Sequence, residues 1–167
     1  NVFFIYFMSD ERALDHLLST VQGKALTDPH VIKYNTGRRK VFWNKNCIAL
    51  GLSSGFVEPL ESTSIYMFMI GVVRLIKMFP FNGINKSVVD EYNQQSIEEL
   101  EGIRDFIILH YKATEREDSE FWRYCKYMSV PDSLKHKLEL FRESGHYFQG
   151  DKELFRTSSW LHVMMGQ

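Results

Sequence analysis

Two carboxylates, Glu58 and Glu61, stand three residues apart on either side of Pro59 and Leu60. A carboxylate held in place can act as a general base, and the proline ring limits how the segment between them moves. A carboxylate near a helix start is also a common stabilising charge, because the positive end of the helix dipole favours it. The spacing alone therefore names no reaction.

The next three residues, Ser62, Thr63 and Ser64, precede a long apolar run. The first N–H groups of a helix lack intrahelical partners and lie at its positive end, so this start suits an anion. Hydroxyl residues at this place are also the usual helix caps. Gly55, a few residues earlier, permits close approach of a planar cofactor. Both interpretations, an anion site and a simple cap, stay open at this point.

The elements that would position these residues are a strand, a loop and a helix. The apolar run 47–52 predicts a buried strand, the Gly- and Pro-containing residues 53–60 predict a loop, and residues 63–79 predict a helix that Pro80 ends. Ligands of nucleotide- and flavin-binding sheets bind at such junctions. The helix is too short for a membrane span and holds Arg74 and Lys77, so we expect it to be fully buried.

The rest of the chain predicts a helix-rich protein with few strands, an α+β fold that is mainly α-helical. The expected elements are a strand at 2–7, a helix from Ser9 to about Val21, strands at 31–34 and 39–43 around the turn 35–37, a long helix capped by Ser87 that carries Val88 to Tyr111, a charged turn at 115–118, and short helices at 121–127, 131–141 and 158–165.

Composition narrows the class of protein. The 167 residues are 44% hydrophobic and 25% charged, which is typical of a globular domain. Twenty basic and 21 acidic residues leave a net charge of −1, so neither nucleic acid nor a membrane surface is an expected partner. Cys47 and Cys125 are far apart, which favours a reducing, cytoplasmic location, and the six histidines lack metal-ligand spacing. The apolar start, without methionine or basic residues, predicts that the chain begins inside a larger protein.

Read as a string, GRRKVFWNKNCIALGLSSGFVEPLESTSIY resembles the flavin-dependent tryptophan halogenases. The block Glu58 to Thr63 carries the resemblance, and flanking matches extend it over nearly the whole chain. They include Gly37, Arg38, Trp43, Asn46, Cys47, Gly51, Leu52, Phe56, Arg104 to Phe106, His110, Tyr111, Thr114, Arg116, Asp118, Phe121, Trp122 and Ser159 to Val163.

The resemblance implies a halogenation reaction. Reduced FAD, supplied by a flavin reductase, would act with O₂ on chloride or bromide to give hypohalous acid. This oxidant would halogenate an aromatic small molecule such as tryptophan or an indole. The family's catalytic glutamate maps onto Glu61, which would hold the lysine-bound oxidant or take the proton from the substrate. The halide would lie against Thr63 and Ser64, and the flavin ring against Ser54, Gly55 and Phe56.

The resemblance also sets limits. Ser64 stands where several members have glycine, and the catalytic lysine, the GxGxxG motif and the WxWxIP motif are not in this sequence. We therefore expect the chain alone neither to hold FAD tightly nor to turn over. It would consist of residues 1–80, the C-terminal part of a flavin-monooxygenase-like α/β domain, and residues 81–167, a helical subdomain on the substrate side. Apolar surface would be exposed around residues 2–7 and 47–56.

Substrate contacts and assembly are less closely defined by the resemblance. Aromatic side chains near the C-terminus, Tyr147, Phe148 and Trp160, would line the substrate pocket, although such residues are more often simple core aromatics. His110, inside an apolar helix, is expected to be a hydrogen-bonded core histidine. A homodimer is compatible with the sequence.

Three alternatives stay open on the sequence. A related flavin monooxygenase would hydroxylate its substrate without oxidising halide, and a non-catalytic helical domain would use the loop only as a cap. Gly51 to Gly55 also fits the G-x-S-x-G string of a hydrolase. That motif needs a helix directly after the serine, whereas Glu58 and Pro59 intervene here, so it is the least favoured of the three.

Overall fold

The computed structural model describes residues 9–150 and 153–166. Its chain divides into two compact units, residues 1–37 and 38–167. The predicted boundary at residue 80 comes from the domain organisation of the family and stays a prediction. Each unit is described by itself.

Between residues 9 and 37, the first unit contains one helix, α1 (Asp10–Thr20), as predicted. Ser9 caps it, because its side chain accepts a hydrogen bond of 3.3 Å from the backbone N–H of Arg12. None of its residues is buried. The strand predicted at 2–7 lies outside the described residues.

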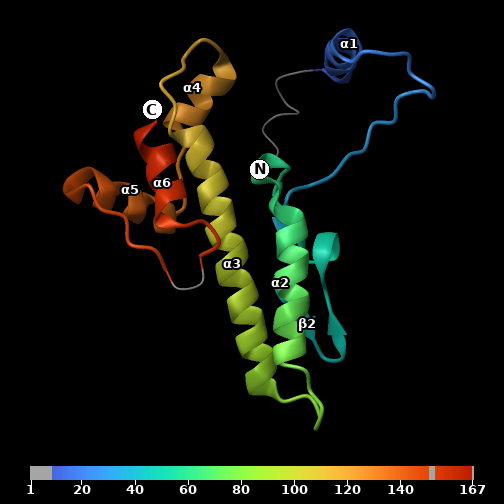
Figure 1. The fold of residues 1–167 in the computed structure, drawn as a ribbon, viewed down its shortest axis with the longest axis vertical. Coiled ribbons are helices and arrows are strands. Elements are labelled where there is room, and N and C mark those ends of the chain that lie inside the picture. Colours follow the sequence, from blue (N-terminus) through green and yellow to red (C-terminus); the bar gives the residue numbers. More distant parts are fainter. Residues whose placement is uncertain (1–8, 151–152, 167) are drawn as a thin grey trace. The chain divides into compact units, whose positions relative to one another are not determined.

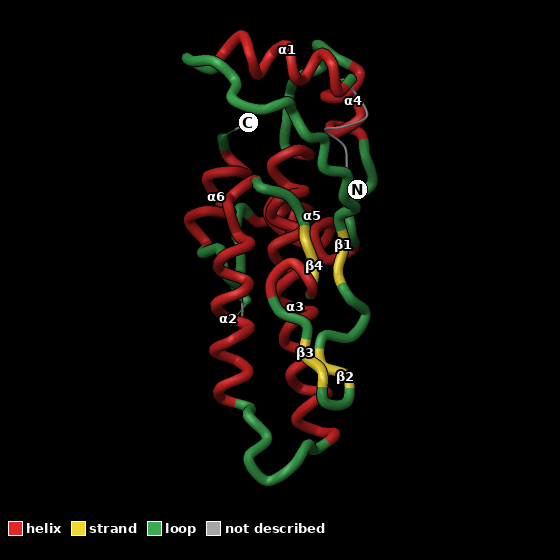
Figure 2. The backbone as a smooth tube through the Cα atoms, turned by 90° about the vertical axis from the view of Figure 1, so that its right-hand side faces the viewer, coloured by secondary structure: helices red, strands yellow, loops and turns green. Residues whose placement is uncertain are grey.

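The second unit is mainly helical, as predicted (Figure 1). Its strands are short segments that form two separate two-stranded sheets (Figure 2). The helices are α2 (Thr63–Lys77), α3 (Lys86–Lys112), α4 (Glu120–Tyr127), α5 (Asp132–Ser144) and α6 (Thr157–Met165), with 3₁₀ turns at Gly51–Ser53 and Leu60–Ser62. Strand β1 (Gly37–Arg38), which contains the boundary between the units along the chain, pairs with β4 (Gly55–Phe56). Strand β2 (Trp43–Asn44) pairs with β3 (Cys47–Ile48).

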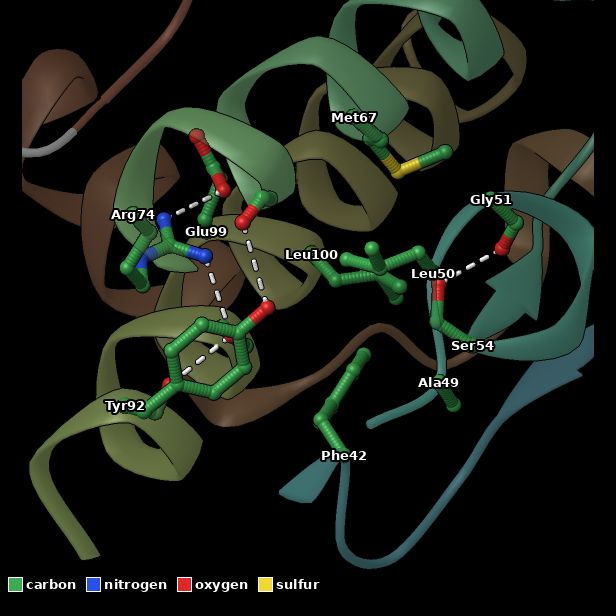
Figure 3. Close-up of a pocket in the computed structure, with 12 residues that line it drawn as sticks. Phe42, Ala49, Leu50, Gly51, Ser54, Met67, Arg74, Tyr92, Glu99 and Leu100 are labelled. Atoms are coloured by element: carbon green, nitrogen blue, oxygen red, sulfur yellow. Dashed lines mark hydrogen bonds and ion pairs between the residues drawn. The ribbon is translucent and has the colours of Figure 1, made fainter. Parts of the chain in front are cut away.

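Helices α2 and α3 pack side by side in opposite directions, joined by the turn between Lys77 and Lys86 (Figure 1). A largely buried ion pair connects them, with Arg74 Nη2 2.7 Å from Glu99 Oε2. Arg74 also donates to Ser96 Oγ at 2.9 Å, and the Tyr92 hydroxyl donates to the carbonyl of Gly71 at 3.2 Å (Figure 3). These contacts fix the register of one helix against the other.

Helix α3 is about 40 Å long at 1.5 Å per residue, and it serves two hydrophobic clusters. Its first half packs with α2 and the β2–β3 hairpin, and its second half packs with α5, α6 and the segment between them. The first cluster is built on Phe42, Trp43, Tyr92 and Leu100. The second is built on Phe106, Leu109, Leu134, Tyr147 and Trp160.

The predicted hairpin around residues 35–37 is wrong. Residues 31–36 form no strand, and the antiparallel pair that does form joins Trp43 to Ile48. The Asn93 side chain of α3 explains the position of this hairpin. Its Oδ1 accepts from the backbone N–H groups of Phe42 and Trp43 at 2.8 and 2.7 Å, and its Nδ2 donates to the carbonyl of Trp43 at 2.9 Å. A contact fifty residues away along the chain therefore sets this strand.

The buried strand predicted at 47–52 is also largely wrong. Only Cys47–Ile48 is strand, and neither residue is fully buried. Gly51 has a φ of +60°, a left-handed conformation that turns the chain into the 3₁₀ turn 51–53. The predicted loop 53–60 contains the short strand β4.

Helix α2 begins where predicted and ends at Lys77, two residues early, but it is not fully buried in this chain. Only Thr63 and Gly71 are buried. One face packs on α3, whereas the side chains on the other are exposed: Ile65, Phe68, Met69, Val73 and Ile76. Within residues 47–56, where apolar surface was expected, Leu52 is exposed, and α2 adds a larger exposed apolar face. The apolar surface expected at 2–7 lies outside the described residues. No helix in the described part of the chain is long and apolar enough to cross a membrane.

The predicted helices after residue 80 are confirmed, with one cap corrected. Helix α3 begins at Lys86 after Asn85, one residue before the predicted cap Ser87, and Asn85 makes no side-chain cap bond. Helices α4 and α6 each begin one residue before the predicted start, and α5 begins one residue after it.

Replacing Glu99 by alanine should destabilise the intact protein by about 3 kcal/mol, because it leaves the Arg74 guanidinium buried without its counter-charge. Chemical denaturation measures the loss. The control is Asp90→Ala, which breaks the exposed Lys86–Asp90 pair within α3 and should cost less than about 1 kcal/mol. Equal losses in the two variants would show that the α2–α3 ion pair does not hold these helices together.

Candidate active site

The loop that carries the two carboxylates has an unusual backbone. Glu61 has φ 64° and ψ 0°, and Ser62 has φ 51° and ψ 36°, so two successive non-glycine residues adopt left-handed conformations. Each costs about 1–3 kcal/mol, and such residues persist where surrounding contacts hold them. These two residues end the 3₁₀ segment Leu60–Ser62 directly before α2, and the Glu61 side chain contacts His110 on α3.

Glu61 meets His110 on α3. His110 Nε2 lies 3.1 Å from Glu61 Oε1, and both side chains are partly exposed, 23% for the histidine and 37% for the glutamate. The other ring nitrogen of His110, Nδ1, lies 2.9 Å from the carbonyl oxygen of Phe106, one turn earlier in the helix. The ring is therefore oriented by its own helix and presents Nε2 to the carboxylate.

Glu58 meets the next residue of the same helix. The Tyr111 hydroxyl donates to Glu58 Oε1 at 2.7 Å. Burial raises the pKa of Tyr111 well above its usual value, and the hydrogen bond to Glu58 raises it further. The phenol therefore stays protonated and remains a donor throughout the neutral range.

The predicted halide residues, Thr63 and Ser64, are the first two residues of α2. Ser62, at the N-cap, makes no side-chain cap bond to the helix. Thr63 is 3% exposed, and its Oγ1 has no hydrogen-bond partner within the described residues. A buried hydroxyl without a partner at the positive end of a helix fits an anion as the missing partner.

The predicted flavin residues form a compact turn next to β1. Ser54 donates from both its N–H and its hydroxyl to the carbonyl of Gly51, at 2.9 and 2.6 Å. The carbonyl of Ser54 accepts from the N–H of Arg39 at 2.9 Å. Because these polar groups of Ser54 are engaged within the turn, the residue can shape a surface for a cofactor rather than donate to one. Gly55 and Phe56 follow as strand β4.

The predicted substrate residues separate into two environments. Tyr147 and Trp160 are buried and stack with ring centroids 5.0 Å apart, whereas Phe148 is 69% exposed. The rings of Trp160 and Phe106 meet edge-on with their centroids 5.0 Å apart, and the ring centroids of Phe106 and His110 are 4.7 Å apart. A continuous chain of contacts thus leads from Trp160 to Glu61, although Trp160 and Tyr147 are themselves core residues.

His110 and Tyr111 are the functional candidates that sequence reasoning missed. His110 was expected to be only a core histidine, and the partner of Glu58 was not foreseen. Both residues belong to the second block of family matches, which was the available signal. Spacing gave no signal, because His110 lies 49 positions after Glu61 in the chain. Within residues 9–150 and 153–166, no group of three or more His, Cys, Asp or Glu side chains is placed to hold a metal ion.

The sequence pattern of the tryptophan halogenase family matches residues 1–167. The chain belongs to the tryptophan halogenase family. A similar tryptophan halogenase is the 7-chloro-L-tryptophan 6-halogenase KtzR of Kutzneria sp. (strain 744), which is 37% identical over 138 residues. The match covers 81% of this chain and 27% of KtzR, so the chain spans only about a quarter of that relative.

Two solved halogenase structures resemble the chain closely. Xcc4156, a flavin-dependent halogenase from Xanthomonas campestris, has a TM-score of 0.89 at 47% identity, covering 96% of this chain and 32% of its own. BrvH, a flavin-dependent halogenase from Brevundimonas sp. BAL3, has a TM-score of 0.88 at 43% identity. The match covers 95% of this chain and 33% of BrvH. The mainly helical fold predicted for a halogenase fragment is therefore confirmed.

Tyr111→Phe should lower the free energy of unfolding of the intact protein by about 1–3 kcal/mol at pH 7, because Glu58 loses a half-buried donor. The raised pKa of Tyr111 gives the sign of the pH dependence. Its contribution is present below the ordinary tyrosine value near 10 and is lost as pH rises above it, because the unfolded phenol ionises first. Unfolding measured from pH 7 to 11 should therefore show the gap between wild type and variant narrowing above about pH 10.

The matched control is Tyr127→Phe, which removes a hydrogen bond of 2.9 Å to Glu117 at an exposed position. Water replaces that bond, so this variant should unfold like the wild type at pH 7. A Tyr111→Phe variant as stable as this control would contradict a holding role for Tyr111.

Proposed function

We propose that this chain is the C-terminal portion of a flavin-dependent halogenase, which uses FADH₂, O₂ and halide to halogenate an aromatic substrate such as tryptophan or another indole. Membership of the tryptophan halogenase family supports the reaction class. The observation that carries the proposal is local. The carboxylate of Glu61 precedes, by two residues, a helix start whose buried Thr63 hydroxyl has no hydrogen-bond partner in the described part of the chain.

The halide would bind at the start of α2. Thr63 and Ser64 are the first two residues of α2, and the first N–H groups of an α-helix have no carbonyl acceptor within the helix. Both N–H groups could therefore donate to a halide, and the Thr63 hydroxyl would add a third donor. Ser64 occupies the second helical position in an ordinary right-handed helix, so a glycine is not needed there. The substitution of serine for the glycine of several members is thus compatible with this site.

Bound reduced flavin and halide would each give two electrons to O₂, which yields hypohalous acid and water. The aromatic C–H bond is then replaced by a carbon–halogen bond, and water forms from the oxygen of the hypohalous acid. Glu61 would take the proton that leaves the ring carbon, which is general-base work. The turn made by Ser54, Gly55 and Phe56 would lie against the flavin ring.

The partners follow from this reaction. The substrate is an aromatic small molecule, and a flavin reductase supplies the FADH₂. Phe148 is exposed and offers a ring to a ligand directly, whereas Tyr147 and Trp160 would support the substrate side from the core. The protein would act in the cytoplasm, and the division into residues 1–80 and 81–167 would separate the flavin side from the substrate side.

Activity should be tested on the intact protein, with its upstream region present. FAD, a flavin reductase with NADH, air and bromide are supplied with a panel of indoles and phenols, and products are read by mass spectrometry. We expect a brominated product that disappears in Glu61→Gln while flavin binding is unchanged. Oxygenated product without halogen would establish the hydroxylase instead, and no flavin binding at all would contradict the proposal.

Thr63→Val tests the halide site separately. The change keeps the shape of the side chain but removes the hydroxyl, so the KM for bromide should rise several-fold, in line with one lost hydrogen bond of about 0.5–1.5 kcal/mol. Stability should not fall, because the hydroxyl bonds to none of the residues that the structure describes. Steady-state kinetics with varied bromide measure the effect, and the KM for the aromatic substrate serves as the internal control. An unchanged KM for bromide would place the halide elsewhere.

A further inference from the structure

His110 makes two contacts, one from each ring nitrogen. The carbonyl oxygen of Phe106 can only accept a hydrogen bond, so Nδ1, 2.9 Å away, is its donor. The other ring nitrogen, Nε2, lies 3.1 Å from Glu61 Oε1, within ion-pair distance. The contact of Nδ1 with α3 therefore holds the ring in place, and Nε2 is the nitrogen that faces the carboxylate.

We propose that His110 is the positioning residue of Glu61, and that Tyr111 anchors the same loop through Glu58. The proposal rests on the proposed catalytic role of Glu61. His110 holds Oε1 of Glu61, while Oε2 makes no hydrogen bond to the part of the chain that the structure describes. That second oxygen is then the one available to the substrate proton.

Both contacts, His110 with Glu61 and Tyr111 with Glu58, are needed because the loop that they hold has a strained backbone. Glu61 and Ser62 both have left-handed backbones, and a single flexible contact would let the turn relax. The Tyr111–Glu58 hydrogen bond holds the chain three residues before Glu61, and the start of α2 holds it two residues after. Adjacent residues on α3 therefore fix both carboxylates relative to each other and to α2.

The two nitrogens of His110 allow a test that separates positioning from packing. Asparagine places its amide nitrogen near the Nδ1 position, so His110→Asn keeps a donor for the Phe106 carbonyl and loses the contact with Glu61. Glutamine places its amide nitrogen near the Nε2 position, so His110→Gln keeps a donor for Glu61 and loses the bond to Phe106. A structural role predicts that asparagine is the better replacement, and a positioning role predicts glutamine.

The measurement is steady-state halogenation by the intact protein with FAD, reductase, bromide and an accepted aromatic substrate. We expect kcat to fall about 10–100-fold in His110→Asn, with KM and flavin content little changed, because a displaced base slows the chemical step rather than binding. His110→Gln should recover most of that loss. His136→Asn, an exposed histidine on α5, is the matched control. Full activity in His110→Asn, or a lower kcat in His110→Gln than in His110→Asn, would overturn the proposal.

A second readout does not depend on turnover. In the intact protein labelled with ¹⁵N-histidine, the Nε2 resonance of His110 should shift in Glu61→Gln, because the carboxylate beside that nitrogen is replaced by an uncharged amide. Identical signals in the two proteins would overturn the assignment. If the wild type forms no halogenated product, the proposed function fails, and this comparison still decides whether His110 and Glu61 are coupled.

Discussion

The candidate site depends on two side-chain contacts between the loop that joins β4 to α2 and helix α3. His110 and Tyr111 are consecutive residues near the end of that helix, and they contact Glu61 and Glu58 at 3.1 and 2.7 Å. Without these contacts, two left-handed residues in succession would be an uncompensated cost of a few kcal/mol. With them, the strained turn becomes the device that directs a carboxylate away from the axis of α2 and brings it beside the start of that helix.

Contacts that keep α2 and α3 in register would therefore support the proposed role of Glu61. The buried Arg74–Glu99 pair fixes the two helices about three turns away from the site, and the side chain of Asn93 fixes the β2–β3 hairpin to the same helix. At the other end, Phe106 links the helix to the core of α5 and α6 through its ring, while its carbonyl orients His110. Helix α3 thus packs in both hydrophobic clusters and also contacts the two carboxylates, so the clusters hold the helix that positions Glu58 and Glu61.

The sequence predicted the local features well, because they depend on nearby residues. Helix α2 was located from the apolar run that follows Thr63, and Glu61 was selected from the family block of residues 58–63. The strand predicted at 47–52 failed for a local reason, because the left-handed Gly51 turns the chain. The other failures are contacts between distant residues. The hairpin is set by Asn93, and the partner of Glu61 is a histidine 49 residues later. The exposed apolar face of α2 was missed because a hydrophobic pattern shows which residues avoid water, and not whether this chain or another segment covers them.

The most direct test of the account is the structure of the intact protein with FAD and bromide, with the halide located by its anomalous scattering. The account predicts bromide in contact with the backbone N–H groups of Thr63 and Ser64, Glu61 still beside His110, and the left-handed turn at residues 61–62 retained. Bromide bound away from α2, or a Glu61 side chain that has left His110 for another partner, would contradict it.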